Sequence, residues 1–154
     1  MNQIEDTAAE ALLIVERNMY MTLATADGDG RPWASPVWYA PAIDTEFLWV
    51  SEPEARHSRN IAVRREVAIV IFDSTVPIGA AAALYLEAVA EQLSGEAVEG
   101  AIAAYSRRSQ ECGARAWDAA DVRPPADSSL YRATAVTQFV LGPGDRRLPV
   151  SNRR

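Results

Sequence analysis

The chain has 154 residues, a formal net charge of −6 and 49% hydrophobic residues, which is typical of an ordinary globular protein with a sizeable core. The acidic balance argues against a protein that coats nucleic acid or binds an anionic membrane surface, because both functions need broad positive potential. All 15 basic residues are arginine, so the sequence excludes enzymes that hold pyridoxal phosphate through a lysine and kinases with a P-loop lysine.

The N-terminal third predicts a helix followed by a three-strand meander. Apolar and alanine positions over about 7–17 are typical of a helix that packs on a sheet. Alternating residues predict strands over 19–25, 33–39 and 46–51. The glycine-rich segment 27–32 is typical of a tight hairpin turn between the first two strands.

The rest of the chain predicts three more strands with two inserted helices. A helix over about 54–64 leads to a strand over 67–72, whose residues are all apolar. This pattern predicts a strand buried on both faces, with a helix or a second subunit over its outer face. Residues 84–91 and 130–141 alternate as half-exposed strands do, and residues 95–108 form an amphipathic helix that should pack on the barrel.

Together these elements predict an α+β fold, mainly β, with a six-stranded antiparallel split β-barrel and flanking helices. We expect residues 1–154 to form a single domain. No apolar run approaches the roughly 20 residues of a bilayer span, and no secretory signal is apparent, so we expect no membrane contact. One cysteine, Cys112, and one histidine, His57, cannot build a structural zinc site, so we expect no metal and a reducing, cytoplasmic location.

The strongest local pattern is a set of cations where the helix over 54–64 begins. Arg56, His57 and Arg59 lie in its first turns, directly after a strand. Helix N-termini carry unpaired N–H groups and partial positive charge, so these cations predict a phosphate site. The alternative is an ordinary solvated helix start, with Glu52 and Glu54 as its acidic residues.

Three passages, in this order, resemble the pyridoxamine phosphate oxidase-like, FMN-binding split-barrel family over nearly the whole chain. Residues 21–25 with 29–39 resemble the first hairpin of that family. Residues 47–72 resemble its strand, phosphate-binding turn and next strand, and residues 84–91 resemble a later strand. The resemblance implies a homodimer with FMN across the interface.

The resemblance also implies site residues. Trp38 is the first choice for an apolar wall beside the flavin, with Trp33 and Trp49 as alternatives. Arg59 adds a further cation to the cofactor set. The implied ring-bordering residues are Ser35, Pro36, Val37 and Trp38, those at the ribityl chain or phosphate are Val50 and Ser51, and those that hold the phosphate are Arg56 and His57.

The implied function is an FMN-binding oxidoreductase that acts on an unidentified small molecule. The oxidase proper has an arginine and a lysine where Ser35 and Ala40 fall, so oxidation of vitamin B6 is not expected. Alternatives are a deazaflavin-coenzyme-dependent reductase, in which Arg59 and Arg64 serve a longer acidic tail, and a non-catalytic protein that holds flavin or haem.

Many members of the family that the chain resembles carry lysine where His57 stands. An imidazole is fully charged only near or below its usual pKa of about 6.5, so anion affinity is expected to weaken as pH rises. We do not expect His57 to act as a general base, because the sequence suggests no serine, cysteine or acid partner beside it.

Overall fold

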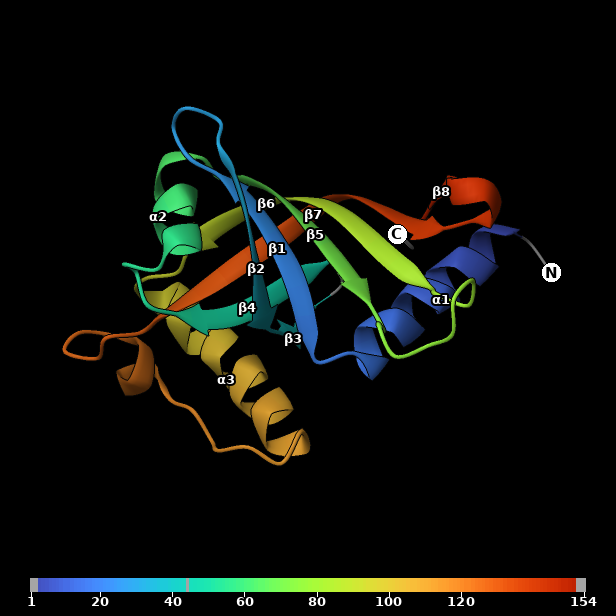
Figure 1. Cartoon of the computed structure of the whole chain (residues 1–154). Coiled ribbons are helices and arrows are strands. Elements are labelled where there is room, and N and C mark those ends of the chain that lie inside the picture. Colours follow the sequence, from blue (N-terminus) through green and yellow to red (C-terminus); the bar gives the residue numbers. More distant parts are fainter. Residues whose placement is uncertain (1–2, 44, 152–154) are drawn as a thin grey trace.

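The computed structural model describes residues 3–43 and 45–151, and Figure 1 shows the order of their elements. The helices are α1 (Gln3–Arg17), α2 (Arg56–Val63) and α3 (Glu96–Glu111), with short 3-10 helices η1 (Ala119–Val122) and η2 (Pro143–Asp145). The strands are β1 (Tyr20–Ala26), β2 (Pro32–Trp38), β3 (Ala40–Pro41), β4 (Glu46–Ser51), β5 (Glu66–Phe72), β6 (Ala83–Gln92), β7 (Ser129–Leu141) and β8 (Arg147–Pro149).

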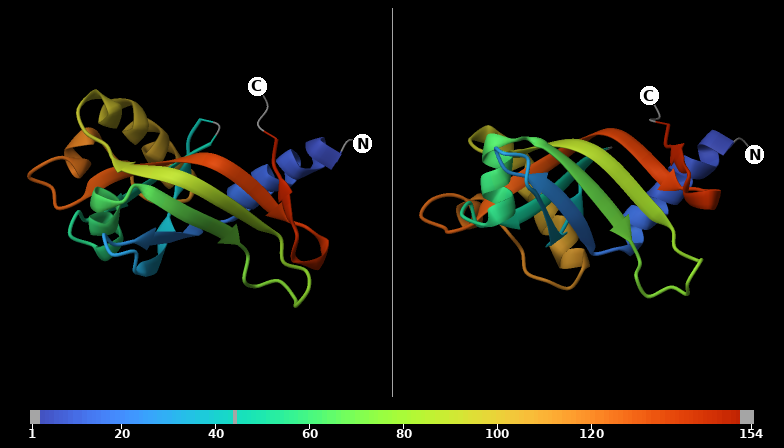
Figure 2. Two further views of the ribbon diagram at one scale, coloured as in Figure 1. Left: turned by 90° about the horizontal axis from the view of Figure 1, so that it is seen from above. Right: turned by 45° about the horizontal axis from the view of Figure 1, so that its top comes forward.

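All these strands join one antiparallel sheet that curls into a split barrel. The strand order is β2-β1-β5-β6-β7-β4-β3, and β8 pairs with β7. β2 and β3 therefore lie at opposite edges of the sheet, yet only Tyr39 separates them in the chain. Because one residue spans only about 3.5 Å, the two edges must come together in space. Figure 2 shows the accompanying curvature of β5, β6 and β7.

Successive apolar residues of β4 serve two different cores. Phe47 and Trp49 point into the barrel, where Ile14 and Val15 of α1 also pack. Leu48 points outward to a second core beneath α3. The outer core contains Ala40, Leu48, Leu93, Val98, Ile102, Tyr105, Val122 and Leu130. The predicted packing of the first and third helices on the sheet is therefore confirmed.

The predicted α+β split barrel is confirmed, with its six long strands and three helices. β3 and β8 were missed, because they have two and three residues and are too short to show alternation. α2 begins at Arg56 and not near residue 54, because residues 52–55 form a turn in which the Ala55 N–H donates to the Glu52 carbonyl at 3.1 Å. No helix in the described part of the chain has the length and apolar character that a membrane span requires.

Of the two covers predicted for the outer face of the 67–72 strand, a helix is not seen among the described residues, and a second subunit stays a prediction. Val67, Ile69 and Ile71 of β5 are buried on the inner face. Ala68 and Phe72 on the outer face are exposed, and no described helix covers them. The apolar composition of β5 therefore leaves an accessible apolar surface on the outside of the sheet.

Candidate functional site

The split in the barrel places β2, β4 and α2 around one end of the molecule. β3 pairs only with Phe47 and Leu48 of β4, so residues 49–51 have no strand partner on that side within the described chain. β2 forms the opposite edge of the sheet. α2 follows β4 directly and packs on β1 and β2. The segments that contain the predicted site residues therefore flank the split.

α2 begins without the usual means of neutralising a helix N-terminus. Its N-cap residue is Ala55, no side chain caps the first amides, and the first turn contains no acidic residue. In contrast, α3 has two glutamates in its first turn. Arg56 and Arg59 add positive charge to the partial charge of the α2 amides. The geometry thus provides the concentrated positive potential that the sequence predicted.

His57 and Ser51 form a hydrogen-bonded pair at the junction of β4 and α2. His57 Nε2 lies 2.9 Å from Ser51 Oγ, because the turn over 52–55 folds the helix back onto the end of the strand. The expectation that no serine stands beside His57 is therefore wrong. Within the described residues no carboxylate pairs with the imidazole, so the pair lacks the third group that orients a catalytic histidine.

Burial lowers the pKa of His57 below its ordinary value of 6.5. The unfolded chain therefore binds this proton more tightly than the folded protein does. We expect the His57 contribution to reduce the free energy of unfolding as pH falls through 6.5 towards the folded-state pKa. Urea titrations of the wild type and His57→Gln at about pH 8 and about pH 5.5 measure this contribution. The same pH dependence in both proteins would contradict the assignment.

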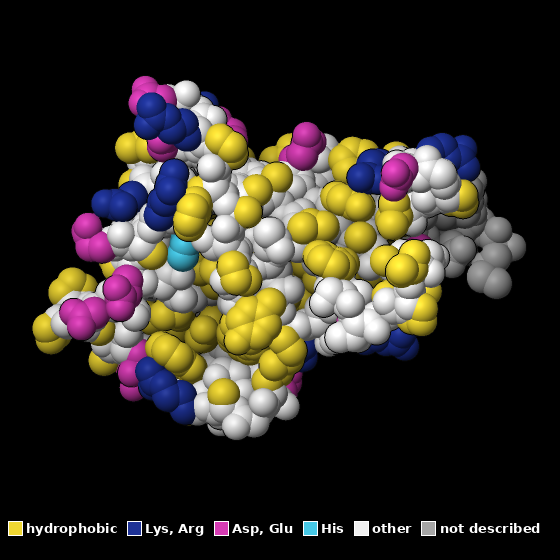
Figure 3. Space-filling view, in the orientation of Figure 1, with side chains coloured by type: hydrophobic (Ala, Val, Ile, Leu, Met, Phe, Trp, Pro, Cys, Tyr) yellow, Lys and Arg dark blue, Asp and Glu magenta, His cyan; other side chains and the backbone are white. Residues whose placement is uncertain are grey.

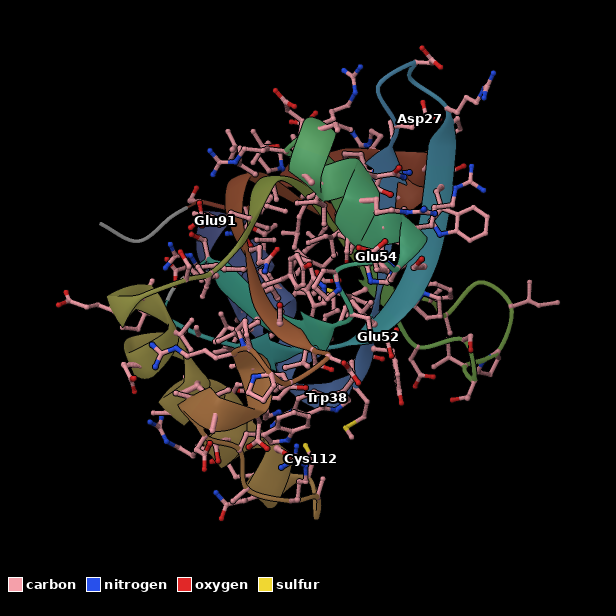
Figure 4. All side chains as sticks on the ribbon, turned by 90° about the vertical axis from the view of Figure 1, so that its left-hand side faces the viewer. Asp27, Trp38, Glu52, Glu54, Glu91 and Cys112 are labelled. Atoms are coloured by element: carbon pink, nitrogen blue, oxygen red, sulfur yellow. The ribbon has the colours of Figure 1, made fainter. Side chains whose placement is uncertain are left out.

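Arg56 stacks on an aromatic ring of the neighbouring hairpin. Its guanidinium carbon lies 4.2 Å from the centroid of the Trp33 ring on β2. The sequence suggested Trp33 as an apolar wall or a stacking surface for a flavin and gave no sign of this contact with Arg56. Figure 3 shows the histidine at the surface with arginine side chains beside it, and Figure 4 shows Glu52 and Glu54 in the turn before α2.

Two further contacts fasten α2 to the β1–β2 hairpin. Asn60 Nδ2 donates to Thr25 Oγ1 at 3.0 Å, and both side chains are buried. Arg64 donates from Nε to the carbonyl of Asp27 at 3.2 Å. Arg64, which the sequence suggested for an acidic cofactor tail, is thus hydrogen-bonded to the hairpin. Arg59 is exposed and forms no ion pair with a described residue.

The predicted ring-bordering residues of β2 do not gather around α2. Val37 is buried in the barrel core, Pro36 is exposed and Ser35 is half-buried. Trp38 packs edge-to-face on Tyr105 of α3, with ring centroids 5.1 Å apart. Figure 4 shows Trp38 on the side of the molecule towards α3. The structure thus brings together Ser51, Arg56 and His57, and it places Trp38 in the outer core.

Two cavities of the described chain are lined by neither Ser51 nor His57, and the Val50 side chain packs elsewhere. Val50 is half-buried and, like Trp38, packs against the outer core. A groove of about 700 Å³ lies between α1, β3 and β4, and it contains none of the predicted site residues. A hollow of about 190 Å³ lies between α2, β6 and β7. Among the described side chains, no three His, Cys, Asp or Glu groups could hold a metal ion together.

Solved structures share this fold. A heme-binding protein from Mycobacterium smegmatis is 25% identical, with a TM-score of 0.71, and the match covers 94% of this chain. It covers only 57% of the Mycobacterium smegmatis protein, which is longer. HutZ, the heme storage protein of Vibrio cholerae, is 23% identical with a TM-score of 0.68 over 86% of this chain and 92% of its own. A FAD-binding protein from Mesorhizobium loti is 18% identical with a TM-score of 0.66 over 87% of this chain and 93% of its own.

The sequence itself also has a family match. No curated protein matches it. The family model described as pyridoxamine 5'-phosphate oxidase, however, matches residues 7–139, from α1 to the end of the long strand β7. That range includes the hairpin, the β4–α2 junction and the core of the split barrel. The chain therefore belongs to the pyridoxamine 5'-phosphate oxidase family.

Proposed function

We propose that the protein is an FMN-binding oxidoreductase that works as a homodimer and holds the phosphate of FMN at the start of α2. The observation that supports this most strongly is the β4–α2 junction. There an uncapped helix N-terminus, the Arg56 guanidinium and the Ser51–His57 pair occur together. Backbone amides, a planar guanidinium and two side-chain hydrogen-bonding groups are a suitable donor set for a phosphomonoester.

The remaining residues would position the flavin ring. A bound flavin supplies the redox chemistry, so the chain has only to bind it, orient it and exclude water. We assign Ser35, Pro36 and the backbone of Val37 to the border of the ring, because they lie on the edge strand at the split. Trp38 and Val50 would support this border from the side of α3.

A second copy would cover the outer face of β1 and β5. Tyr20 is 60% exposed and Phe72 is 45% exposed there. The pairing of Thr22 with Val70 places Tyr20 and Phe72 opposite each other at the same end of the two strands. Figure 3 views this side of the molecule and shows mainly apolar and uncharged side chains at its centre, with charged side chains around the edge. Soluble monomers rarely leave such surfaces open.

The dimer proposal also accounts for the position of the cavities. In a homodimer with twofold symmetry, one copy can contribute the phosphate-binding groups while the other closes the ring site. A site of this kind is not a deep pocket in an isolated chain. The absence of the predicted residues from the groove beside α1 is consistent with such a shared site.

Haem binding is the second candidate, and it comes from a different class of function. The Mycobacterium smegmatis structure, which is 25% identical over 94% of this chain, is named as a heme-binding protein. His57 is the only histidine in the sequence and would be the natural iron ligand. The deazaflavin coenzyme ranks lower, because Arg64 is engaged by the hairpin and only Arg59 remains for an acidic tail.

The direct experiment is an absorption spectrum of freshly purified protein, followed by titration with FMN, the deazaflavin coenzyme and haemin. We expect a two-band flavin spectrum or tight uptake of FMN. Uptake of haemin alone, lost in His57→Ala, would replace the proposal with haem binding. A protein that takes up none of the three would contradict both candidates.

We further propose that the oxidoreductase works in the cytoplasm on a small molecule. The sole cysteine, Cys112, cannot form an intrachain disulfide, as is usual for proteins of reducing compartments. Oxygen and nicotinamide cofactors are the first electron partners to assay with the FMN-loaded protein. Slow flavin reduction by every donor would favour a storage or sensing role.

A further inference from the structure

Arg56 is one of the arginines of the described chain that form no ion pair and that lie over an aromatic ring, as Arg147 lies over Tyr85. Each of five others forms an ion pair with Asp or Glu, namely Arg65, Arg108, Arg115, Arg123 and Arg132. Within the described residues Arg56 has no ion pair, and its partner is the Trp33 ring. The guanidinium is therefore held in place without being neutralised.

Asp27, a carboxylate of the hairpin, already accepts hydrogen bonds from the turn. Asp27 Oδ1 accepts hydrogen bonds from the backbone N–H groups of Asp29 and Arg31, each at 2.9 Å. Arg56 contributes only through its charge to the lowered pKa of Asp27, behind the stronger effect of the Arg31 amide. The β1–β2 hairpin thus contacts Arg56 through the Trp33 ring, whereas the Asp27 carboxylate hydrogen-bonds to the backbone of the hairpin turn.

The contact with Trp33 leaves the N–H donors of the Arg56 guanidinium available to a ligand. The guanidinium carbon lies over the ring, and a guanidinium carries five N–H donors at the edge of its plane. An anion can therefore bind at the edge while the stack persists. A side chain that is already restrained also loses less conformational freedom when it binds.

The strand that carries the ring is tied to α2. Trp33 lies opposite Thr25 in the β1–β2 register. Thr25 in turn accepts the Asn60 hydrogen bond from α2. The backbone of Trp33 and the helix that begins at Arg56 are thus connected, which places the ring within reach of the Arg56 side chain.

We propose that Trp33 is a positioning residue for the phosphate of FMN, which acts through Arg56 and does not contact the ligand. This inference rests on the proposed function. If Trp33 acts only through Arg56, replacing it should weaken the binding of the phosphate group and leave the binding of the flavin ring unchanged. FMN and riboflavin share the ring and differ in the phosphate, so they form a matched pair of probes.

The test uses the full chain and measures dissociation constants for FMN and riboflavin from flavin fluorescence. Trp33→Leu should weaken FMN binding about 3- to 5-fold, as expected for loss of a cation–π contact, and leave riboflavin binding unchanged. Trp33→Phe should retain most of the FMN affinity, because it keeps an aromatic face. In an Arg56→Ala background, Trp33→Leu should have no further effect.

Three results would overturn the inference while the wild type still binds FMN. They are an unchanged FMN affinity in Trp33→Leu, an equal loss for FMN and riboflavin, and a loss that persists in the Arg56→Ala background. A wild type that fails to bind FMN overturns the proposed function itself, together with this inference. If Trp33→Leu does not fold, Arg56→Lys keeps the charge, removes the planar stack and should weaken FMN but not riboflavin.

Discussion

Replacing Val70 with aspartate is expected to break the dimer and to remove most FMN binding with it. Val70 lies near the middle of the outer face, opposite Thr22 of β1 and Tyr85 of β6. In a single copy the carboxylate would be hydrated, because this position is only half-buried. In the proposed interface it would be buried without a partner, at a cost of about 3–5 kcal/mol. The dimer should therefore weaken by about 100-fold or more.

Light scattering coupled to gel filtration measures the mass of each variant, and a flavin titration at the same concentrations measures FMN binding. Val70→Thr is the matched control, because it keeps the β-branched shape and adds no charge. We expect this control to stay dimeric and to bind FMN. A Val70→Asp protein that remains a dimer with wild-type FMN affinity would move the interface away from β5.

Local periodicity was enough to predict the long strands. The alternation in β6 and β7 and the apolar run of β5 give clear signals over seven or more residues. β3 and β8 gave none, since they exist only where a longer strand offers an edge to a passing segment. Which element covers the outer face of β5 could not be predicted for a related reason. An apolar strand shows that both faces avoid water, but it does not show whether the cover belongs to the same chain.

In the candidate site too, the sequence indicated contacts between neighbouring residues but not contacts between distant ones. Ser51, Arg56 and His57 are close in sequence, so a strand–turn–helix pattern could group them. The hydrogen bond between Asn60 and Thr25 joins residues 35 positions apart, and no local sequence pattern predicts it. The Arg56–Trp33 stack is also a tertiary contact, set by how the hairpin meets α2.

In β2, neighbouring side chains point to opposite faces of the sheet, which limits how many of them can border one ligand. Four consecutive residues were assigned to one ring border, but side chains of a strand alternate between faces. The structure accordingly buries Val37 in the barrel and places Trp38 against Tyr105. A strand segment can border a ligand only through every second side chain and through its backbone. Assignments along β2 therefore have to be made residue by residue.

Replacing Arg56 with alanine is expected to weaken FMN binding by about 1.5–3 kcal/mol, which is the contribution of a hydrogen bond to a charged group. This corresponds to a loss of roughly 10- to 150-fold in affinity. The reason is that the uncapped start of α2 has no other guanidinium stacked in a fixed position. Isothermal titration with FMN measures the change, and riboflavin binding should remain as in the wild type.

A control must separate a specific contact from a general loss of positive charge. Arg107→Ala removes the same charge from the exposed surface of α3, so it should leave FMN affinity nearly unchanged. If both variants weaken FMN equally, long-range attraction and not a contact at α2 accounts for the effect, and added salt should then remove the difference from wild type. If Arg56→Ala alone is impaired and the loss persists in salt, the guanidinium binds the phosphate directly. Unchanged affinity in Arg56→Ala would remove this residue from the phosphate role and leave the Ser51–His57 pair as the anion-binding group to test next.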